Sequence, residues 1–282
     1  IKRIFKAIND FFGKKKEKEW EDRSKEAKSV ESKVNKKDTI DSIKALEENS
    51  KEGKDLLYQM TSTHLYGYDP DKKEIVKPLD IIKGSMDMSG IVEVKEYPLK
   101  VNEKILKIFT AKDDAEVDTL LEEIKKLRTE NMEKLKNKDK ALPNMSYIEI
   151  DVDKGKMSVV KHPSAIDEVK QKITFDVAKE VAISLVQNVK MVADLSVMLS
   201  HIKPTIEDIK KKIKSNEEIA NETKQYVNDS LKTNTNVSEN KRKEVIKFLT
   251  NMTQTEVSNV QTALKIINNV DKLSIASLAV IK

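Results

Sequence analysis

The apolar residues of positions 164–282 recur every three or four residues, which is the spacing of a helix with one buried face. This stretch has no glycine, and its only proline is Pro204. We therefore expect two or three long helices, broken at Pro204 and again near Asn234. Residues 173–202 are apolar over more than half of the helix circumference, so they should form a central helix covered on two sides. Residues 205–231 are more charged and should be solvated.

Residues at the predicted helix ends refine these boundaries. Ser164 is expected to cap the first long helix and Ser238 the last one, because serine is a favoured N-cap residue. The last helix ends in an apolar segment, and exposed chain ends are normally polar. A cover is therefore needed, from the same bundle, from another chain or from residues that follow. The apolar side chains concerned include Leu273, Ile275, Leu278 and Ile281.

Residues 1–12 have the pattern of a short amphipathic helix that ends at Gly13. Basic side chains occupy most of its other side. Such a helix docks either into a groove on protein or onto a membrane surface. The absence of an initial methionine leaves a processed leader open. Together with the four C-terminal residues above, its apolar residues form the predicted interaction surface: Ile1, Ile4, Phe5, Ile8, Phe11 and Phe12.

The middle of the chain is less regular. Residues 17–60 are highly polar, which fits either a long solvated helix or a partly disordered linker. Residues 61–102 hold half of the glycines, prolines and tyrosines, and strand-like pieces occur at 74–77 and 90–94. We interpret residues 61–102 as a β-rich or irregular insertion.

A helix and a hairpin follow this insertion. Asp114 is expected to cap the helix, and Pro143 ends its pattern. Residues 147–161 alternate polar and apolar side chains around a turn at 153–156, where Gly155 can adopt a positive φ. One hairpin alone is marginal in water, so it should pair with residues 74–101 or with another subunit.

These elements predict a mainly α protein, an elongated helical bundle or coiled-coil-like structure with a small β-hairpin or β-rich insertion. The predicted organisation has four parts. An N-terminal amphipathic helix and charged helical arm comes first, followed by the insertion, a helix with its hairpin, and a C-terminal helical bundle. Their boundaries are 1–60, 61–102, 103–162 and 163–282.

Composition supports long elements with narrow apolar faces. Charged residues make up 36% of the chain and hydrophobic ones 38%, so there is less core per residue than in a compact enzyme. The net charge of +5 arises from nearly balanced charges, and only 5% of residues are aromatic. Platforms for stacking bases are therefore scarce, and a sequence-specific nucleic-acid partner is not expected. There is no run of 18 apolar residues and no cysteine.

The candidate chemistry is sparse. None of the three histidines, His64, His162 and His201, lies four residues from another, so zinc has no sequence support. Asp151-x-Asp153-x-Gly155 resembles the opening of a calcium loop but lacks its later ligands, which favours a hairpin turn. No phosphate loop or nucleophile motif is present. We expect no catalytic residue, no metal and no cofactor.

These features favour a non-enzymatic structural or adaptor protein with protein partners, most simply further copies of itself. The setting would be a larger symmetric assembly, such as a phage or virus particle or an injection-type machine. The alternative is a helical pore-forming or membrane-surface-binding protein that uses residues 1–12. Such a protein is expected in a virion or the cytoplasm, and a secreted protein also fits.

Overall fold

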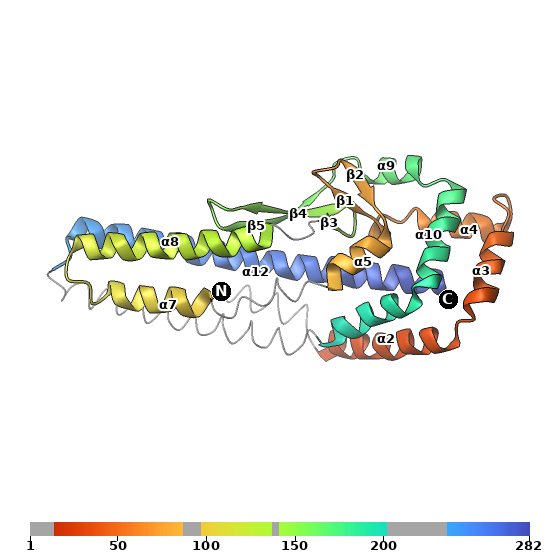
Figure 1. The fold of residues 1–282 in the computed structure, drawn as a ribbon, viewed down its shortest axis with the longest axis horizontal. Coiled ribbons are helices and arrows are strands. Elements are labelled where there is room, and N and C mark those ends of the chain that lie inside the picture. Colours follow the sequence, from red (N-terminus) through yellow and green to blue (C-terminus); the bar gives the residue numbers. More distant parts are fainter. Residues whose placement is uncertain (1–13, 87–96, 137–140, 202–235) are drawn as a thin grey trace.

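The computed structural model describes residues 14–86, 97–136, 141–201 and 236–282. The described part is elongated: a narrow helical arm extends from a wider head that contains the strands (Figure 1). Helices dominate, and the strands form two small antiparallel sheets. The predicted fold class, mainly α with a small β insertion, is confirmed.

Helix α12 (Glu239–Ile281) runs the length of the molecule, from the arm into the head (Figure 1). It has 43 residues, which corresponds to about 65 Å at about 1.5 Å per residue. The side chain of Ser238 accepts a hydrogen bond from the amide of Lys241 at 3.3 Å, so the predicted cap is confirmed.

The arm consists of α7 (Tyr97–Ile108), α8 (Asp114–Lys136) and the first half of α12. Its core contains Val101, Ile105, Ile108, Val117, Leu121, Ile124, Val245 and Met252. The predicted cap of α8 at Asp114 is wrong by one residue, because Asp113 accepts a hydrogen bond from the amide of Glu116 at 2.8 Å. The Asp114 carboxylate instead accepts hydrogen bonds from the amide and hydroxyl of Ser238, which ties α8 to the start of α12.

Residues 14–60 form three helices around the head: α2 (Lys14–Lys33), α3 (Lys36–Ala45) and α4 (Lys51–Met60). Neither sequence interpretation of residues 17–60, one solvated helix or a partly disordered linker, is correct. Each helix buries a few side chains in the head core, among them Trp20, Ala27, Ile43, Leu56 and Met60. A few apolar residues are enough to pack each of these helices on the head, because other elements supply most of the core that they contact.

The predicted helix over residues 164–202 is divided by two bends. The structure has α9 (Ala165–Lys172), α10 (Phe175–Gln187) and a further helix, Val189–His201, bent by 69° from α10. Ser164 makes no capping hydrogen bond, and the hydroxyl of Thr174 caps α10 instead. At the second bend, the side chain and the amide of Asn188 both donate to the Ser184 carbonyl, at 2.8 and 3.2 Å.

The expectation that residues 173–202 lie at the centre is confirmed for the described residues up to 201. Val181, Ala182, Leu185, Val186, Val189, Val192, Leu195 and Leu199 are all buried in the head core. Helices α3 and α10 also cap each other's C-terminal ends. Lys36 Nζ donates to the Gln187 carbonyl at 3.0 Å, and Lys179 Nζ donates to the carbonyls of Lys44 and Leu46 at 2.9 and 3.2 Å. Cations are favourable at helix C-termini.

The strands lie on one side of the head, next to α12 (Figure 1). Strands β1 (Gly67–Asp69) and β2 (Glu74–Val76) form one sheet. The 3-10 helix η1 (Thr63–Leu65) precedes β1, and α5 (Pro78–Met86) follows β2. The second sheet contains β3 (Ala141–Leu142), β4 (Ser146–Asp151) and β5 (Lys156–Lys161). The predicted strand at 90–94 lies outside the described residues.

The predicted hairpin is confirmed, with Gly155 at a φ of +57° in its turn. Its predicted pairing with residues 74–101 is wrong for the described part of that segment, because β2 pairs with β1 and the third strand beside the hairpin is β3. The outer edge of β5 is covered by α12. The amide of Met157 donates to Asn259 Oδ1 at 2.8 Å, and Asn259 Nδ2 donates to the Gly155 carbonyl at 2.9 Å. Side chains of one helix thus take the place of a fourth strand.

Candidate functional site

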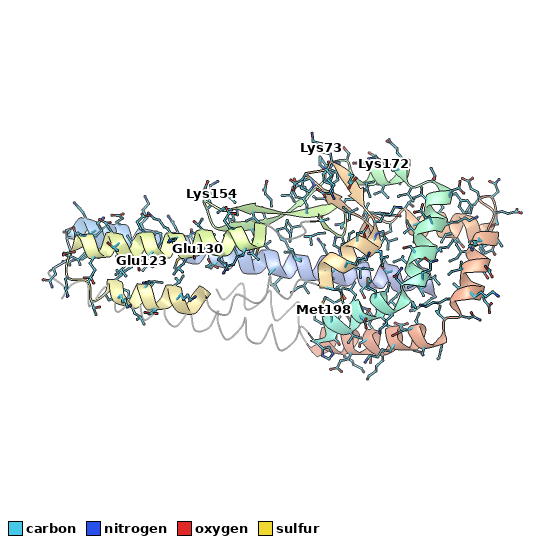
Figure 2. The ribbon with its side chains drawn as sticks, in the orientation of Figure 1. Lys73, Glu123, Glu130, Lys154, Lys172 and Met198 are labelled. Carbon is cyan, nitrogen blue, oxygen red and sulfur yellow. The ribbon has the colours of Figure 1, made fainter. Side chains whose placement is uncertain are left out.

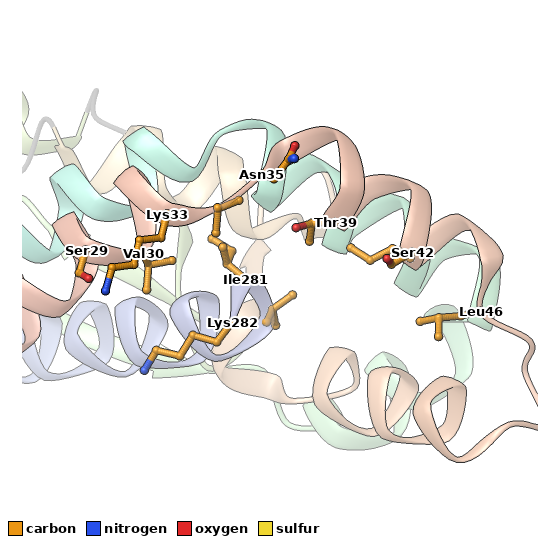
Figure 3. Close-up of a pocket in the computed structure, with 12 residues that line it drawn as sticks. Ser29, Val30, Lys33, Asn35, Thr39, Ser42, Leu46, Ile281 and Lys282 are labelled. Atoms are coloured by element: carbon orange, nitrogen blue, oxygen red, sulfur yellow. The ribbon is translucent and has the colours of Figure 1, made fainter.

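A cleft of about 480 Å³ opens where α2 and α3 meet the C-terminal end of α12 (Figure 3). The turn between α2 and α3 creates it. Asn35 caps α3 by accepting a hydrogen bond from the amide of Asp38, so the chain changes direction immediately after α2. The last turn of α12 ends between the two helices, beside both. The lining residues are Ser29, Val30, Lys33, Val34, Asn35, Thr39, Ser42, Ile43, Leu46, Val280, Ile281 and Lys282.

The walls of this cleft combine apolar side chains with hydroxyl, amide and amine groups. No carboxylate and no imidazole belongs to the lining, so the cleft has no pair of groups for acid–base chemistry at neutral pH. One of its two lysines, Lys282, is paired with Glu26. A volume of this size lies in the range of ligand pockets, about 300–1,000 Å³. The cleft therefore suits binding of an apolar or hydroxyl-bearing group.

Sequence reasoning did not find this cleft. Val30, Val34, Ile43 and Leu46 were visible only as apolar residues scattered through a polar segment. They come together because α2 and α3 fold around the end of α12, which no local pattern encodes.

The C-terminal half of the predicted interaction surface is mostly internal. Leu273, Leu278 and Ile281 are 0%, 2% and 2% exposed and belong to the head core. The apolar C-terminal segment is therefore covered by other helices of the same chain, the first of the three covers considered from the sequence. Ile275 differs, because 45% of it is exposed. The N-terminal half, Ile1, Ile4, Phe5, Ile8, Phe11 and Phe12, lies outside the described residues.

Buried polar contacts fix α12 within the head. Arg23 of α2 forms an ion pair with Asp271, which is 3% exposed. The hydroxyls of Ser196 and Ser274 lie 2.6 Å apart and are both buried. Buried polar groups are costly unless they are paired, so these contacts specify how α2 and the helix Val189–His201 pack on α12. They are structural contacts, and they do not line the cleft.

The predicted chemical candidates are placed as follows. The carboxylate of Asp151 accepts hydrogen bonds from the side chain and amide of Lys154, both at 2.9 Å, and these bonds lower its pKa. The interpretation of this segment as a hairpin turn is confirmed. The ring of His162 packs against Tyr68 with centroids 4.1 Å apart and the ring planes tilted by 41°, and its Nδ1 lies 3.4 Å from Glu168. Over the ranges that the structure describes, no three acidic or histidine side chains are grouped as a metal would need.

Among the described helices, none is by itself long and apolar enough to cross a membrane. The bent pair Phe175–Gln187 and Val189–His201 meets that requirement only when both are taken together. No family model matches this chain, and neither does any curated protein or solved structure. The function is therefore argued from the geometry.

Proposed function

We propose that this chain is a non-enzymatic structural or adaptor protein of a larger symmetric assembly, such as a phage or virus particle or an injection-type machine. The observation that carries this proposal is the role of α12 in two separate cores. Val245 and Met252 belong to the core of the arm, whereas Ile267, Val270 and Leu273 belong to that of the head. One uninterrupted helix therefore holds arm and head at a fixed separation.

A fixed separation serves a protein that positions other molecules. Bending α12 between the cores would break helix hydrogen bonds, and the hairpin braces this section through Asn259 and Thr262. Further polar contacts fix the arm near its tip, where Lys241 bonds Asp118 at 2.7 Å. The described residues thus support a rigid spacer with a groove at its head end, the cleft between α2, α3 and α12.

The proposal predicts self-association of the purified chain. Light scattering coupled to size-exclusion chromatography, with native mass spectrometry, should give a mass that is a multiple of 32.2 kDa. The measurement is made at several concentrations in the tens of micromolar range. A compact monomer at every concentration, with the sedimentation coefficient of a globular protein, would overturn the proposal.

A further inference from the structure

Helix α12 and strand β5 run side by side in the same direction. Thr262 donates to the carbonyl of Met157 at 3.1 Å, and one helical turn later Ile266 packs in a cluster with Val159. A strand rises about 3.3 Å per residue and a helix about 1.5 Å. The four residues from Met157 to Lys161 therefore span about 13 Å, as do about nine residues of α12. This register places the end of β5 level with Asp271 and Lys272.

A third basic side chain comes from η1, which also packs against α12. Burial lowers the pKa of His64, and the charges of Lys272 and Lys161 lower it further. The charges that act on this imidazole are thus both positive, in agreement with the register of α12 and β5. Its Nδ1 is buried without a hydrogen-bond partner. Backbone hydrogen bonds from the amide of Met145 to the Tyr66 carbonyl and from the amide of His162 to the Met145 carbonyl place η1 beside the end of β5. His64, Lys161 and Lys272 therefore come from three elements that meet in one region of the head, and we call them the basic triad.

The carboxylates around the triad are engaged elsewhere. Glu168 of α9 faces His162 and bonds Lys172 at 2.8 Å, and Asp271 of α12 is paired with Arg23. On β1, Asp69 lies 3.4 Å from Lys72. Within the described ranges, no ion pair or side-chain hydrogen bond engages Lys161 or Lys272, and both side chains are exposed. The positive charges of the two lysines are therefore uncompensated and accessible.

The loop between β3 and β4 links the segments that carry His64 and Lys161, and it adds a donor. Asn144 and Met145 have φ values of +65° and +50°. Asparagine tolerates this left-handed region, whereas methionine seldom adopts it. The amide of Met145 donates to the Tyr66 carbonyl at 2.8 Å, and its carbonyl accepts from the amide of His162 at 2.9 Å. Thr63 Oγ1 donates to Asn144 Oδ1 at 3.1 Å, which leaves the Asn144 side-chain amino group available. Within this loop, backbone strain is thus confined to Met145, and strained residues often occur at functional sites.

We propose that His64, Lys161, Lys272 and Asn144 form a binding site for a phosphate-type oxyanion, either free phosphate or the phosphate group of a larger molecule. Two ammonium groups, an imidazole and an amide come from separate elements and can donate to the several oxygens of such an anion. The anion would also compensate the charges of the lysines. This site is separate from the cleft and goes beyond the proposed structural role.

The test is a titration of the intact chain with inorganic phosphate at constant ionic strength, followed by calorimetry and by the NMR signals of the three histidines. We expect saturable binding and a rise in the pKa of His64, because the anion offsets the neighbouring lysine charges. Lys161→Gln and Lys272→Gln should each weaken binding about ten-fold, the typical effect of one charge-assisted hydrogen bond. Lys247→Gln is the matched control, because Lys247 lies on the arm part of α12 and is also exposed.

The outcomes separate cleanly. Phosphate binding that does not saturate would overturn the proposal. Equal weakening of phosphate binding by all three lysine variants would also overturn it, since either result indicates general charge attraction. Vesicles with phosphatidic acid distinguish the sources of the anion. Vesicle binding that free phosphate displaces and that Lys272→Gln weakens supports the site with a lipid headgroup as ligand. Saturable phosphate binding without vesicle binding supports a free phosphate. The proposal is contradicted if phosphate binding does not saturate and if vesicle binding is affected neither by free phosphate nor by Lys272→Gln.

Discussion

Replacing Asn259 by alanine tests whether α12 acts as the missing strand of the β3–β4–β5 sheet. Asn259 is 6% exposed, and both of its hydrogen bonds to the hairpin backbone are buried. Alanine would leave the amide of Met157 and the carbonyl of Gly155 without partners. A buried polar group without a partner costs about 1–3 kcal/mol. The two groups together therefore cost about 2–6 kcal/mol. Alanine has a higher helix propensity than asparagine by about 0.6 kcal/mol, so the free energy of unfolding should fall by about 1.5–5 kcal/mol.

Urea unfolding followed by circular dichroism and by the fluorescence of Trp20, which is buried in the head core, measures this change. Hydrogen exchange adds a local measurement, because the Met157 amide should lose its protection in the variant. Asn251→Ala is the matched control: Asn251 lies on the same helix, is exposed, and contributes only its backbone carbonyl to a hydrogen bond from Thr255. Its free energy of unfolding should rise by only about 0.6 kcal/mol, the gain in helix propensity.

Two results would refute this reasoning. If Asn259→Ala and Asn251→Ala change the free energy of unfolding equally, the buried hydrogen bonds contribute no net stability. If the Met157 amide stays protected in Asn259→Ala, another group covers the strand edge. Thr262→Val gives an independent check, since it removes only the hydroxyl that bonds the Met157 carbonyl. Its cost should be smaller, about 1–2 kcal/mol.

Three further predictions concern other contacts. Gly155→Ala should lower the free energy of unfolding by at least about 1 kcal/mol in urea titrations, because φ is +57° and the new Cβ would lie 1.9 Å from Arg128 Nε. An equal stability of both proteins would contradict this. Asp114→Asn should lower the melting temperature at pH 7, and this difference should shrink as pH falls. Hydrogen bonds from Ser238 lower the pKa of Asp114 in the folded protein. The charged carboxylate therefore stabilises the fold at pH values above the ordinary carboxylate pKa, and this stabilisation disappears as pH falls to the lowered pKa. A difference that is constant down to low pH would count against it. If the membrane alternative is correct, liposome co-sedimentation should retain the intact chain and lose one lacking residues 1–13; retention of neither ends that alternative.

Features encoded over short stretches could be predicted from the sequence. The hairpin at 147–161 is specified by alternation and one glycine, and the start of α12 by Ser238. The bends within 164–201 could not be predicted in this way, because neither contains proline or glycine. At Asn188 the side chain bonds the Ser184 carbonyl while the tertiary core covers both helices. Asparagine is tolerated within a helix as well as at its end, so only packing decides between them.

The candidate sites depended even more on tertiary structure. The cleft joins residues of α2 and α3 to the last turn of α12, almost 250 positions later. The basic triad joins three elements in the same way, and His64 and Lys161 carried no motif in the sequence. By contrast, the sequence correctly indicated that Leu273, Leu278 and Ile281 need a cover. Periodicity reveals that a face is apolar, but it does not identify the partner.

The distribution of exposed apolar residues restricts how copies of this chain could associate. Tyr58, Leu106, Ile166, Ile246 and Ile275 are the larger examples in the described ranges, and they come from α4, α7, α9 and α12. They are spread over the arm and the head, and stable interfaces need a contiguous patch of about 800 Å² per partner. The proposed self-association therefore places its main contacts on the cleft, on polar helix faces or on residues outside the described ranges. Removing residues 1–13 in the light-scattering experiment distinguishes these: loss of the oligomer would assign the contact to Ile1–Phe12, and an unchanged oligomer would assign it to the described surface.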